Sequence, residues 1–449
     1  MSTRLQRTFG TATNNKIFTV SVWVKKQKVG FTHVLLEGSG VSHGRPSPQL
    51  LLNSSGRLIL DSYNGSDYDV RLHSTRLFRD LNGWYHVVMA VDTTQATASN
   101  RVKFYVNGEQ ITDFESGLES YPSQNLVLSM NHSTHHVIGG SANAGFSGGN
   151  EHCIMSHYHL TDGTTYDASA FGETDSTTGE WKIKTSPSVT YGNNGFFILK
   201  DGNSVTDQSG NSNNWTVGQG TLTKTEDNPS NVFATLNPLA TSTTSGSFSN
   251  GNTTHAKSNS TWASTTSTLA ASSGKYYAEY KFTANSSSSN GQMAAIVNMD
   301  LTNYMNENSD LEQNGNKGIT YYANGTVFAD NQQTVATYSS YGDAIIQIAM
   351  DLDNGFLYFG KDGTWQNSGV PTSGSTGTGG INISNYIGAG TYAFGLANRN
   401  TGATSVNFGN GYFGTTAVSS AGTNASGNGI FEYDVPTGYT ALSTKGLNL

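Results

Sequence analysis

Histidines gather between residues 132 and 159, where six of the 11 histidines of the chain lie. His157 and His159 are two residues apart in an expected strand, so their side chains point to one face. This pair can hold Zn²⁺ if His135 or His136 supplies a third ligand. Two other interpretations stay open: an outward polar strand face, and rings paired in a contact between subunits.

Oxygen-bearing side chains lie close together at Asp201, Asn203 and Asp207, in a segment that also contains glycine. Carboxylate and amide oxygens are hard ligands of the kind that Ca²⁺ prefers. The same residues are typical of Asx turns, in which the side chain accepts an N–H group of its own loop and no ion is needed. Structural Ca²⁺ and Zn²⁺ are therefore the cofactors that the sequence allows, and no other cofactor is expected.

Acidic pairs suited to glycoside hydrolysis are sparse. A retaining glycosidase places its two carboxyl groups about 5 Å apart. The nearest candidates are Glu173 with Asp175 and Glu432 with Asp434. Neither pair has a third acid at a suitable spacing, and both lie near the ends of expected domains. Cys153, the single cysteine, lies in an apolar strand-like stretch and is interpreted as a core residue. We therefore predict a protein that is not an enzyme.

The composition limits the fold and the partners. Only 12% of the 449 residues are charged, whereas glycine (52 residues) and aromatic residues (11%) are abundant. The aromatic content argues against a disordered chain, and the shortage of charged residues argues against helical bundles. A net charge of −8 supplies no basic field for nucleic acid. Tyr, Phe, Val and Thr suit pleated strands, and Gly and Asn suit tight turns, so we expect an all-β fold.

Runs of β-branched and aromatic residues predict the strands that would position these side chains. The clearest runs lie at residues 17–24, 84–92, 102–106, 275–282 and 344–353. The segment between the two groups is less regular. We predict two β-sandwich domains, at residues 1–172 and 241–449, joined by an irregular extension and connector at residues 173–240.

The first ten residues contain no apolar stretch of the kind that a signal peptide or a membrane span requires. The longest apolar runs of the chain are only a few residues long. We expect the chain to be made in a host cytoplasm without membrane insertion. It would then reach the outside of a cell by lysis or within a particle.

Short phrases in the sequence resemble known families. The first part resembles the laminin-G-like, concanavalin A-like jelly-roll family in the strand of Trp23 and at residues 84–88 and 102–108. The second part resembles the SPRY family, another β-sandwich, at residues 276–279, 342–343, 349–355 and 406–409. The whole chain resembles structural proteins of marine and freshwater tailed bacteriophages, in which a jelly-roll segment precedes a SPRY-like segment. Four phrases in the expected order carry this last resemblance, at residues 170–174, 231–239, 272–279 and 431–442.

The phage resemblance implies a virion structural protein, such as a tail fibre, spike or head fibre, that contacts the host surface. It implies other virion proteins as partners and a homo-oligomer, which we expect to be a trimer. A surface of hydroxyl and amide groups with many tyrosines also suits host-surface glycans, because sugars present hydroxyls and apolar C–H faces. Two alternatives stay open: a capsid or tail decoration protein without glycan binding, and a polysaccharide depolymerase.

The SPRY resemblance implies that loops at one end of the second sandwich bind partners. We predict that the binding surface is formed by Tyr321, Tyr322, Tyr338, Tyr341 and Trp365. Neighbouring residues of a strand point to opposite faces, so Tyr321 and Tyr322 cannot both face one core, and we expect one of them at the surface or in an interface. The alternative is that several of these rings are core residues.

Overall fold

The computed structural model describes residues 3–38, 48–64, 66–140, 153–200, 204–241, 246–283, 291–301 and 310–448. Antiparallel strands make up nearly all of its regular structure, and within these ranges the single α-helix, α1 (Ser384–Ile387), is four residues long. The all-β fold class expected from the sequence is confirmed. No helix in the described ranges is long and apolar enough to cross a membrane.

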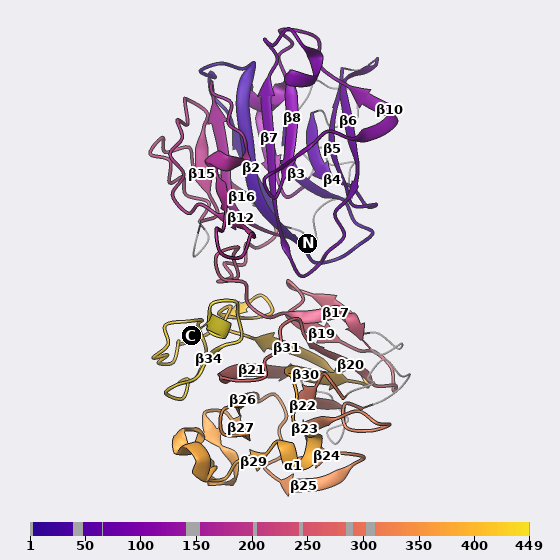
Figure 1. The fold of residues 1–449 in the computed structure, drawn as a ribbon, viewed down its shortest axis with the longest axis vertical. Coiled ribbons are helices and arrows are strands. Elements are labelled where there is room, and N and C mark those ends of the chain that lie inside the picture. The colour runs from indigo at the N-terminus through magenta and orange to yellow at the C-terminus, as the bar shows by residue number, and fades with distance from the viewer. Residues whose placement is uncertain are drawn as a thin grey trace. The chain divides into compact units, whose positions relative to one another are not determined.

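The chain folds into two compact units, each with its own sheets and core. The first unit contains residues 1–224 and 228–230, and the second contains residues 225–227 and 231–449. In Figure 1 the first runs from indigo to magenta and the second from pink to yellow. The segment at residues 173–240, predicted as an extension packed on the first domain and then a connector, divides between the two units. Most of it packs on the first unit, because the strand near residue 197 is added to the edge of the smaller sheet of that unit and the strand near residue 217 to the edge of the larger sheet.

Two antiparallel sheets form the first unit. The larger sheet has the strand order β10-β6-β5-β4-β3-β11-β1-β16 and the smaller sheet β15-β12-β2-β7-β8-β9. A two-stranded hairpin, β13-β14, packs beside the smaller sheet. The strands are β1 (Arg4–Thr8), β2 (Ile17–Lys26), β3 (His33–Gly38), β4 (Gln49–Leu52), β5 (Arg57–Tyr63), β6 (Tyr68–Leu77), β7 (Trp84–Asp92), β8 (Val102–Val106), β9 (Glu109–Ile111), β10 (Phe114–Ser120), β11 (His135–Ile138), β12 (Cys153–Asp162), β13 (Gly172–Thr174), β14 (Trp181–Ile183), β15 (Phe196–Ile198) and β16 (Thr216–Gln219).

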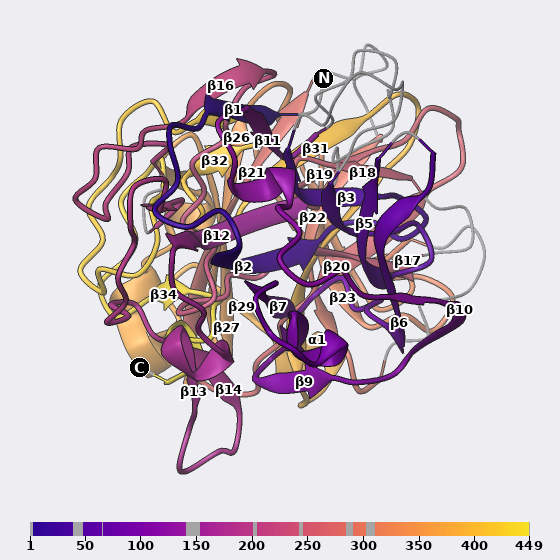
Figure 2. The same ribbon diagram turned by 90° about the horizontal axis from the view of Figure 1, so that it is seen from above.

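Strand β2 shows how the alternation in the sequence builds this unit. Its valines at positions 20, 22 and 24 face the core between the sheets, while Ser21 and Trp23 point to the opposite face. Strands β12 and β7 pair with its two edges, and Figure 2 shows the three strands side by side. Both faces of β2 are buried, because the chain that follows β12 covers the outer face of the smaller sheet.

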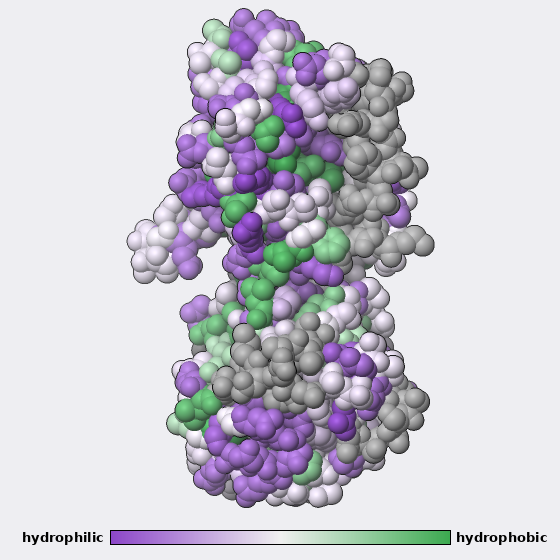
Figure 3. Space-filling view, turned by 90° about the vertical axis from the view of Figure 1, so that its right-hand side faces the viewer, coloured by the Kyte–Doolittle hydropathy of each residue, from purple (hydrophilic) through white to green (hydrophobic). Residues whose placement is uncertain are grey.

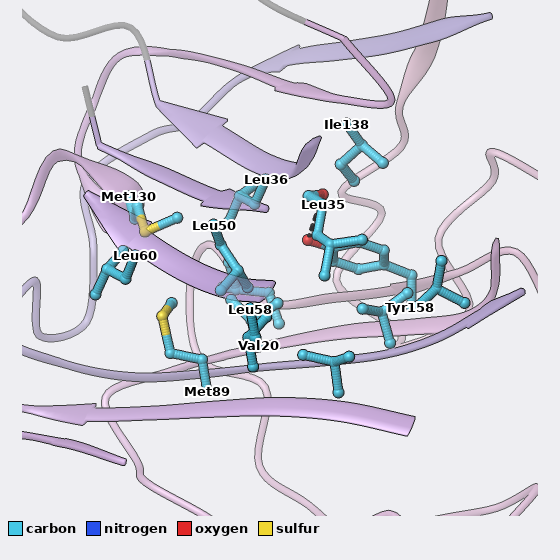
Figure 4. Close-up of a cluster of buried hydrophobic side chains, with 14 of the residues drawn as sticks. Val20, Leu35, Leu36, Leu50, Leu58, Leu60, Met89, Met130, Ile138 and Tyr158 are labelled. Atoms are coloured by element: carbon cyan, nitrogen blue, oxygen red, sulfur yellow. Dashed lines mark hydrogen bonds between the residues drawn. The ribbon is translucent and has the colours of Figure 1, made fainter. Parts of the chain in front are cut away.

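The core of the first unit is a continuous layer of aliphatic and aromatic side chains from both sheets. Figure 4 shows part of it, with leucines of β3, β4 and β5 against Val20 and Met89. Tyr158 reaches from β12 into this layer, where its hydroxyl donates a 3.1 Å hydrogen bond to the carbonyl of Leu35. The bond satisfies a polar atom that would otherwise be costly to bury.

The second unit is also a two-sheet sandwich. One sheet has the order β17-β20-β30-β22-β23-β24-β25, and the other β18-β19-β31-β21-β26-β27-β28, with β29 paired to β27 and β34 paired in parallel to β21. A small hairpin, β32-β33, lies outside both sheets. The strands are β17 (Leu236–Thr241), β18 (Ser247–Ser249), β19 (Thr254–Ala256), β20 (Ala263–Ser267), β21 (Lys275–Thr283), β22 (Gln292–Asn298), β23 (Gly318–Tyr322), β24 (Thr326–Ala329), β25 (Gln333–Thr337), β26 (Ile345–Asp351), β27 (Phe356–Lys361), β28 (Thr364–Trp365), β29 (Ile381–Asn382), β30 (Tyr392–Asn398), β31 (Ala403–Asn407), β32 (Tyr412–Phe413), β33 (Thr416–Ala417) and β34 (Thr440–Ala441).

A buried carboxylate fixes the irregular C-terminal segment on the second sandwich. Glu279 of β21 accepts hydrogen bonds of 2.8 Å from the backbone N–H groups of Glu432 and Tyr433. The Tyr277 hydroxyl and the Asn407 amide donate to the same carboxylate. Burial raises the pKa of Glu279 to about 7, against these four donors, which favour the ionised form. The two backbone hydrogen bonds to this carboxylate, called the Glu279 clamp below, hold Glu432 and Tyr433 against a sheet to which neither residue contributes a strand.

The surface agrees with the low charge content of the sequence. On the face that Figure 3 shows, purple and pale residues predominate over green ones. The described ion pairs are few. The pairs of Arg76 with Glu109 and of Lys182 with Glu173 are exposed, and exposed pairs contribute little to stability.

Candidate functional site

A pocket of about 370 Å³ opens on the second unit. This volume is at the lower end of the range for small-molecule sites. The lining combines one cation, one carboxylate, two phenols, two aliphatic hydroxyls and several glycines. The lining residues are Gly274, Lys275, Tyr276, Asp353, Ala425, Ser426, Gly438, Tyr439, Thr440 and Gly446.

The pocket forms where β21 begins and the C-terminal segment returns to it. Tyr276 of β21 pairs in parallel with Thr440 of β34. Asn428 holds this return in place, because its amide donates to the hydroxyls of Thr440 (2.8 Å) and Ser443 (3.1 Å). The Ser426 hydroxyl donates to Asn424 at 2.7 Å, which closes the loop on the other side. The walls are thus fixed by side-chain hydrogen bonds.

Gly274 brings two polar groups of the pocket together. Its backbone N–H donates a 2.7 Å hydrogen bond to Oδ1 of Asp353. Its φ is +89°, and a Cβ atom there would lie 2.7 Å from the hydroxyl oxygen of Tyr276. Only glycine fits this combination of dihedral angle and close contact. The Asp353 carboxylate and the Tyr276 hydroxyl therefore both lie next to one backbone position.

Lys275 is partly neutralised by a buried partner. Its ammonium group lies 2.9 Å from Oδ2 of Asp351, whose side chain is 0% exposed, while that of Lys275 is 24% exposed. Asp351 also accepts hydrogen bonds from the amide group of Asn354. The Lys275 ammonium lies 5.9 Å from the centre of the Tyr439 ring, whose hydroxyl donates to the carbonyl of Pro371. The lysine is therefore held in position between a carboxylate and an aromatic face.

Hydrogen-bonding capacity remains unused in the pocket. Asp353 uses Oδ1 for Gly274, and within the described part of the chain no group bonds to its Oδ2 or to the Tyr276 hydroxyl. Burial and the Asp353 charge raise the pKa of Tyr276, so its hydroxyl stays neutral and can donate as well as accept. The arrangement suits a small ligand that carries several hydroxyl groups.

The aromatic residues predicted as a binding surface lie elsewhere, and three of them are buried. Tyr321 is 0% exposed, and Tyr322 and Tyr341 are each 4% exposed. The expectation that Tyr321 or Tyr322 is at the surface is wrong, because both faces of β23 are covered. Tyr321 packs in the core between the sheets, and Tyr322 packs with Trp262 in a second cluster on the outer face.

Tyr338 and Trp365 are half-buried and also serve as packing residues. Tyr338 contacts the ring of Tyr321 edge-on, with 5.4 Å between centroids. Trp365 contacts the ring of Tyr277. The prediction that these five aromatic residues form a binding surface is therefore wrong, because three of them lie in the core and two pack at its edge. The prediction failed because it assumed one covered face per sheet.

The predicted histidine metal site is not formed. Strand β11 with His135 and His136 belongs to the larger sheet of the first unit, whereas β12 with His157 and His159 belongs to the smaller sheet. His136 is buried with both ring nitrogens facing carbonyl oxygens, of Thr134 at 2.8 Å and Ser129 at 2.9 Å. No group of three metal-binding side chains occurs in the described residues.

His157 and His159 do share a side of the sheet, as expected. Both rings lie against Phe197, with centroids 5.8 Å and 4.0 Å away. Nδ1 of His159 is hydrogen-bonded to the Tyr191 hydroxyl, and Nδ1 of His157 to the Ser156 hydroxyl. The pair is buried in aromatic packing, which corrects both the metal prediction and the outward-face interpretation.

The predicted calcium ligands divide between described and undescribed residues. Asp201 and Asn203 lie outside the described residues. Asp207 is an Asx-type residue, as the alternative interpretation proposed. Its two oxygens accept hydrogen bonds from the backbone N–H groups of Phe197, Ser209 and Asn213 and from the Ser209 hydroxyl, all between 2.8 and 2.9 Å. Four donors occupy the carboxylate, so the Ca²⁺ prediction is corrected at Asp207.

The acidic pairs are placed in structural roles. Glu173 and Asp175 both lie within 3.3 Å of the Lys182 ammonium in the β13-β14 hairpin. Glu432 accepts the backbone N–H of Ser419, and Asp434 that of Thr423. Cys153 packs against the core of the first unit, and burial raises the pKa of its thiol to about 12.

Sequence reasoning missed the pocket, although two signals pointed near it. The phrases 272–279 and 431–442, which carried the phage resemblance, contain most of its lining. What no pattern indicated is that residues 274–276, 353 and 425–446 converge. That convergence depends on the parallel pairing of β34 with β21 and on the Glu279 clamp.

Comparisons with known proteins bear on the fold of each part. A family model described as the concanavalin A-like lectin/glucanases superfamily matches residues 4–149, about a third of the chain. The first sandwich therefore contains a concanavalin A-like domain, as the sequence resemblance implied. No curated protein matches the chain.

Several solved structures match part of the chain at low sequence identity and low TM-score. The SPRY domain of human HERC1 is 11% identical, with a TM-score of 0.30, and the match covers 38% of this chain and 96% of that domain. The PSpry domain of TRIM65 is 11% identical, with a TM-score of 0.29 and coverages of 39% and 88%. Stonustoxin is 16% identical, with a TM-score of 0.27 and coverages of 39% and 27%. The sheets of the two units show two β-sandwich domains, and the family match identifies the first of them as concanavalin A-like.

Proposed function

We propose that the protein is a non-enzymatic, glycan-binding structural protein of a phage virion, a tail fibre or spike that helps the particle attach to its host. The observation that carries the binding part is the pocket of the second unit. There, Lys275, Tyr276 and Asp353 present donor and acceptor atoms to a small cavity. A sugar hydroxyl both donates and accepts, so it can pair with each of them.

Binding without cleavage fits the carboxylates of the pocket better than hydrolysis. Glycosidases use two carboxyl groups, one on each side of the scissile bond. Asp351 is buried and occupied by Lys275 and Asn354. This leaves Asp353 as the single available carboxylate in the lining. The depolymerase alternative therefore lacks a second acid at this site.

The virion assignment rests on the order of the four phrases that resemble phage structural proteins. A pocket of this size contacts only one or two sugar units, so each site binds weakly. Many copies on one particle can raise the avidity by about 10² to 10⁴ without new contacts. A trimer fits this role, and light scattering of the purified full-length protein that gives only the monomer mass would count against it.

The proposed function is tested by filling the pocket mouth. Ala425 is exposed and lines the pocket, whereas Ala421 is exposed in the same segment and does not line it. We expect the full-length protein to bind host-surface polysaccharide on a glycan array. Ala425→Trp should bind the polysaccharide at least about tenfold more weakly, because an indole ring at the pocket mouth would occupy much of a small cavity. Ala421→Trp should bind it as tightly as the unmodified protein does.

The outcomes separate the proposed function from its rivals. An array that stays blank, together with normal adsorption of virions that lack the protein, would favour a decoration or assembly protein. Shortening of the polysaccharide on incubation with the protein would favour a depolymerase. Equal binding by Ala425→Trp and Ala421→Trp would place the glycan site elsewhere.

A further inference from the structure

We infer that the pocket at the start of β21 recognises an uncharged sugar and discriminates against sugars that carry a carboxylate. This inference rests on the proposed glycan binding and adds the class of sugar. It is carried by the placement of Asp353, Tyr276 and Lys275 around one cavity, and by the buried partner of Lys275.

The fixed charges at the pocket leave it with a net charge of −1. Lys275 supplies the single positive charge, and Asp351, 2.9 Å away, cancels it. Asp353 remains as an uncompensated, exposed carboxylate in the lining. The two phenols of the lining, Tyr276 and Tyr439, have raised pKa values because they are buried, so they add no charge near neutral pH.

The hydrogen-bonding atoms match a pair of neighbouring sugar hydroxyls. The Gly274 N–H bonds to the carboxylate of Asp353, and a Cβ atom at Gly274 would lie 2.7 Å from the hydroxyl of Tyr276, so these two groups flank one residue of the pocket. Oδ2 of Asp353 can accept from one sugar hydroxyl, and the Tyr276 hydroxyl can donate to or accept from the next. Bonds to an ionised acceptor are about twice as strong as neutral ones, so Asp353 contributes most to affinity.

A carboxylate on the sugar would meet the wrong sign of charge. Lys275 would be its natural partner, but the lysine is already paired with Asp351, and separating that pair would leave a buried carboxylate alone. The Asp353 charge would repel the ligand at the short distances of a cavity this small. A uronic acid therefore gains no strong bond and meets a repulsion that a neutral hexose avoids.

The test compares sugars that differ only at C6. Methyl glycosides of glucose, galactose and mannose are titrated into the full-length protein, each beside the glycoside of its uronic acid, with ligand-observed NMR as the readout. We expect each neutral sugar that binds to do so about tenfold or more tightly than its uronate. Added salt should narrow this gap, because salt screens the repulsion at an exposed carboxylate.

A matched pair of variants assigns the discrimination to Asp353. Asp353→Asn keeps the size of the side chain and an oxygen for the Gly274 N–H but removes the charge. It should weaken neutral-sugar binding and abolish the preference over uronates. Asp343→Asn, at an exposed acid of the same unit outside the pocket, should change neither.

Three results would overturn the inference. The first is a uronate that binds the unmodified protein as tightly as its neutral counterpart. The second is a preference that persists in Asp353→Asn. In both of these cases glycan binding itself would stand. The third is binding of no glycoside, neutral or acidic, together with no response to Ala425→Trp on longer polysaccharides, and this result would refute the proposed function as well.

Discussion

Replacing Tyr280 by phenylalanine should stabilise the second unit. The side chain of Tyr280 is 0% exposed in the core between the two sheets. Its hydroxyl is buried and has no hydrogen-bond partner among the described residues. Leaving a buried hydroxyl without a partner costs about 1–3 kcal/mol relative to its hydration in the unfolded chain. Phenylalanine keeps the ring and removes that cost.

Tyr341 in the same core provides the matched control. It is also buried, but its hydroxyl donates a 2.7 Å hydrogen bond to the carbonyl of Tyr321. Tyr341→Phe deletes a satisfied bond and should destabilise the unit by about 1 kcal/mol. Removing a tyrosine hydroxyl is therefore expected to raise the free energy of unfolding at Tyr280 and to lower it at Tyr341, although both lie in one core. Burial raises the pKa of both hydroxyls well above the usual value, so neither result depends on ionisation near neutral pH.

The assay is calorimetric unfolding of the full-length chain, in which the transition of the second unit is followed. For a unit of this size a change of 1 kcal/mol moves the midpoint by about 2–4 °C. We expect Tyr280→Phe to raise the midpoint by that amount and Tyr341→Phe to lower it. If Tyr280→Phe lowers the midpoint as much as Tyr341→Phe does, the Tyr280 hydroxyl has a partner such as a bound water, and the reasoning fails.

Three further predictions concern buried titratable groups. Burial lowers the pKa of His86 to about 3, so His86 takes up a proton in the unfolded chain at a higher pH than in the folded one. The free energy of unfolding of the first unit should therefore fall by up to about 1.4 kcal/mol per pH unit from this residue as the pH falls below 6.5. Urea unfolding at several pH values measures this free energy, and a value that does not change with pH would contradict the prediction. Burial, followed by the charge of Asp310, raises the pKa of Glu312 to about 7, so this residue should make the second unit lose stability as the pH rises from about 4.5 through 7. Glu312→Gln should make the slope of unfolding free energy against pH shallower in the same titration, and the part of the slope that comes from Glu279, whose pKa is also about 7, should remain. Asp162 is buried and accepts four hydrogen bonds, from the backbone N–H groups of residues 13, 14 and 194 and from the Asn131 amide. Asp162→Asn places an NH₂ group against groups that also donate, so it should lower the free energy of unfolding of the first unit by about 2–4 kcal/mol in urea. An unchanged unfolding midpoint would contradict this prediction.

Strand positions could be predicted from the sequence because they depend on local periodicity. The runs at residues 17–24, 84–92 and 102–106 are strands β2, β7 and β8, nearly as expected. The second-domain runs behave in the same way, with β21 and β26 close to their predicted bounds. The alternation of apolar and polar residues in a strand is visible in consecutive residues, so a strand can be recognised without knowledge of its distant contacts.

The site predictions depended on which faces are covered, and no local pattern contains that information. The side chains of Tyr321 and Tyr322 point to opposite faces of their strand, and hydrophobic clusters on both faces bury them. The histidines are close in sequence but belong to two sheets, so the expected ligand set does not converge. Asp207 had two open interpretations, and only the positions of four donors around it decided between them.

The sequence by itself determined that this is an all-β protein with two sandwiches and few charges, because composition and alternation are properties of short segments. Tertiary structure alone decided where a pocket forms. The pocket requires Gly274, Asp353 and Thr440, which are far apart along the chain, to meet at the start of β21. They meet because the buried Glu279 carboxylate of β21 accepts the backbone N–H groups of Glu432 and Tyr433, and because the Asn428 amide donates to Thr440 of β34. Hydrogen bonds between residues that are far apart along the chain produce no periodic pattern in the sequence.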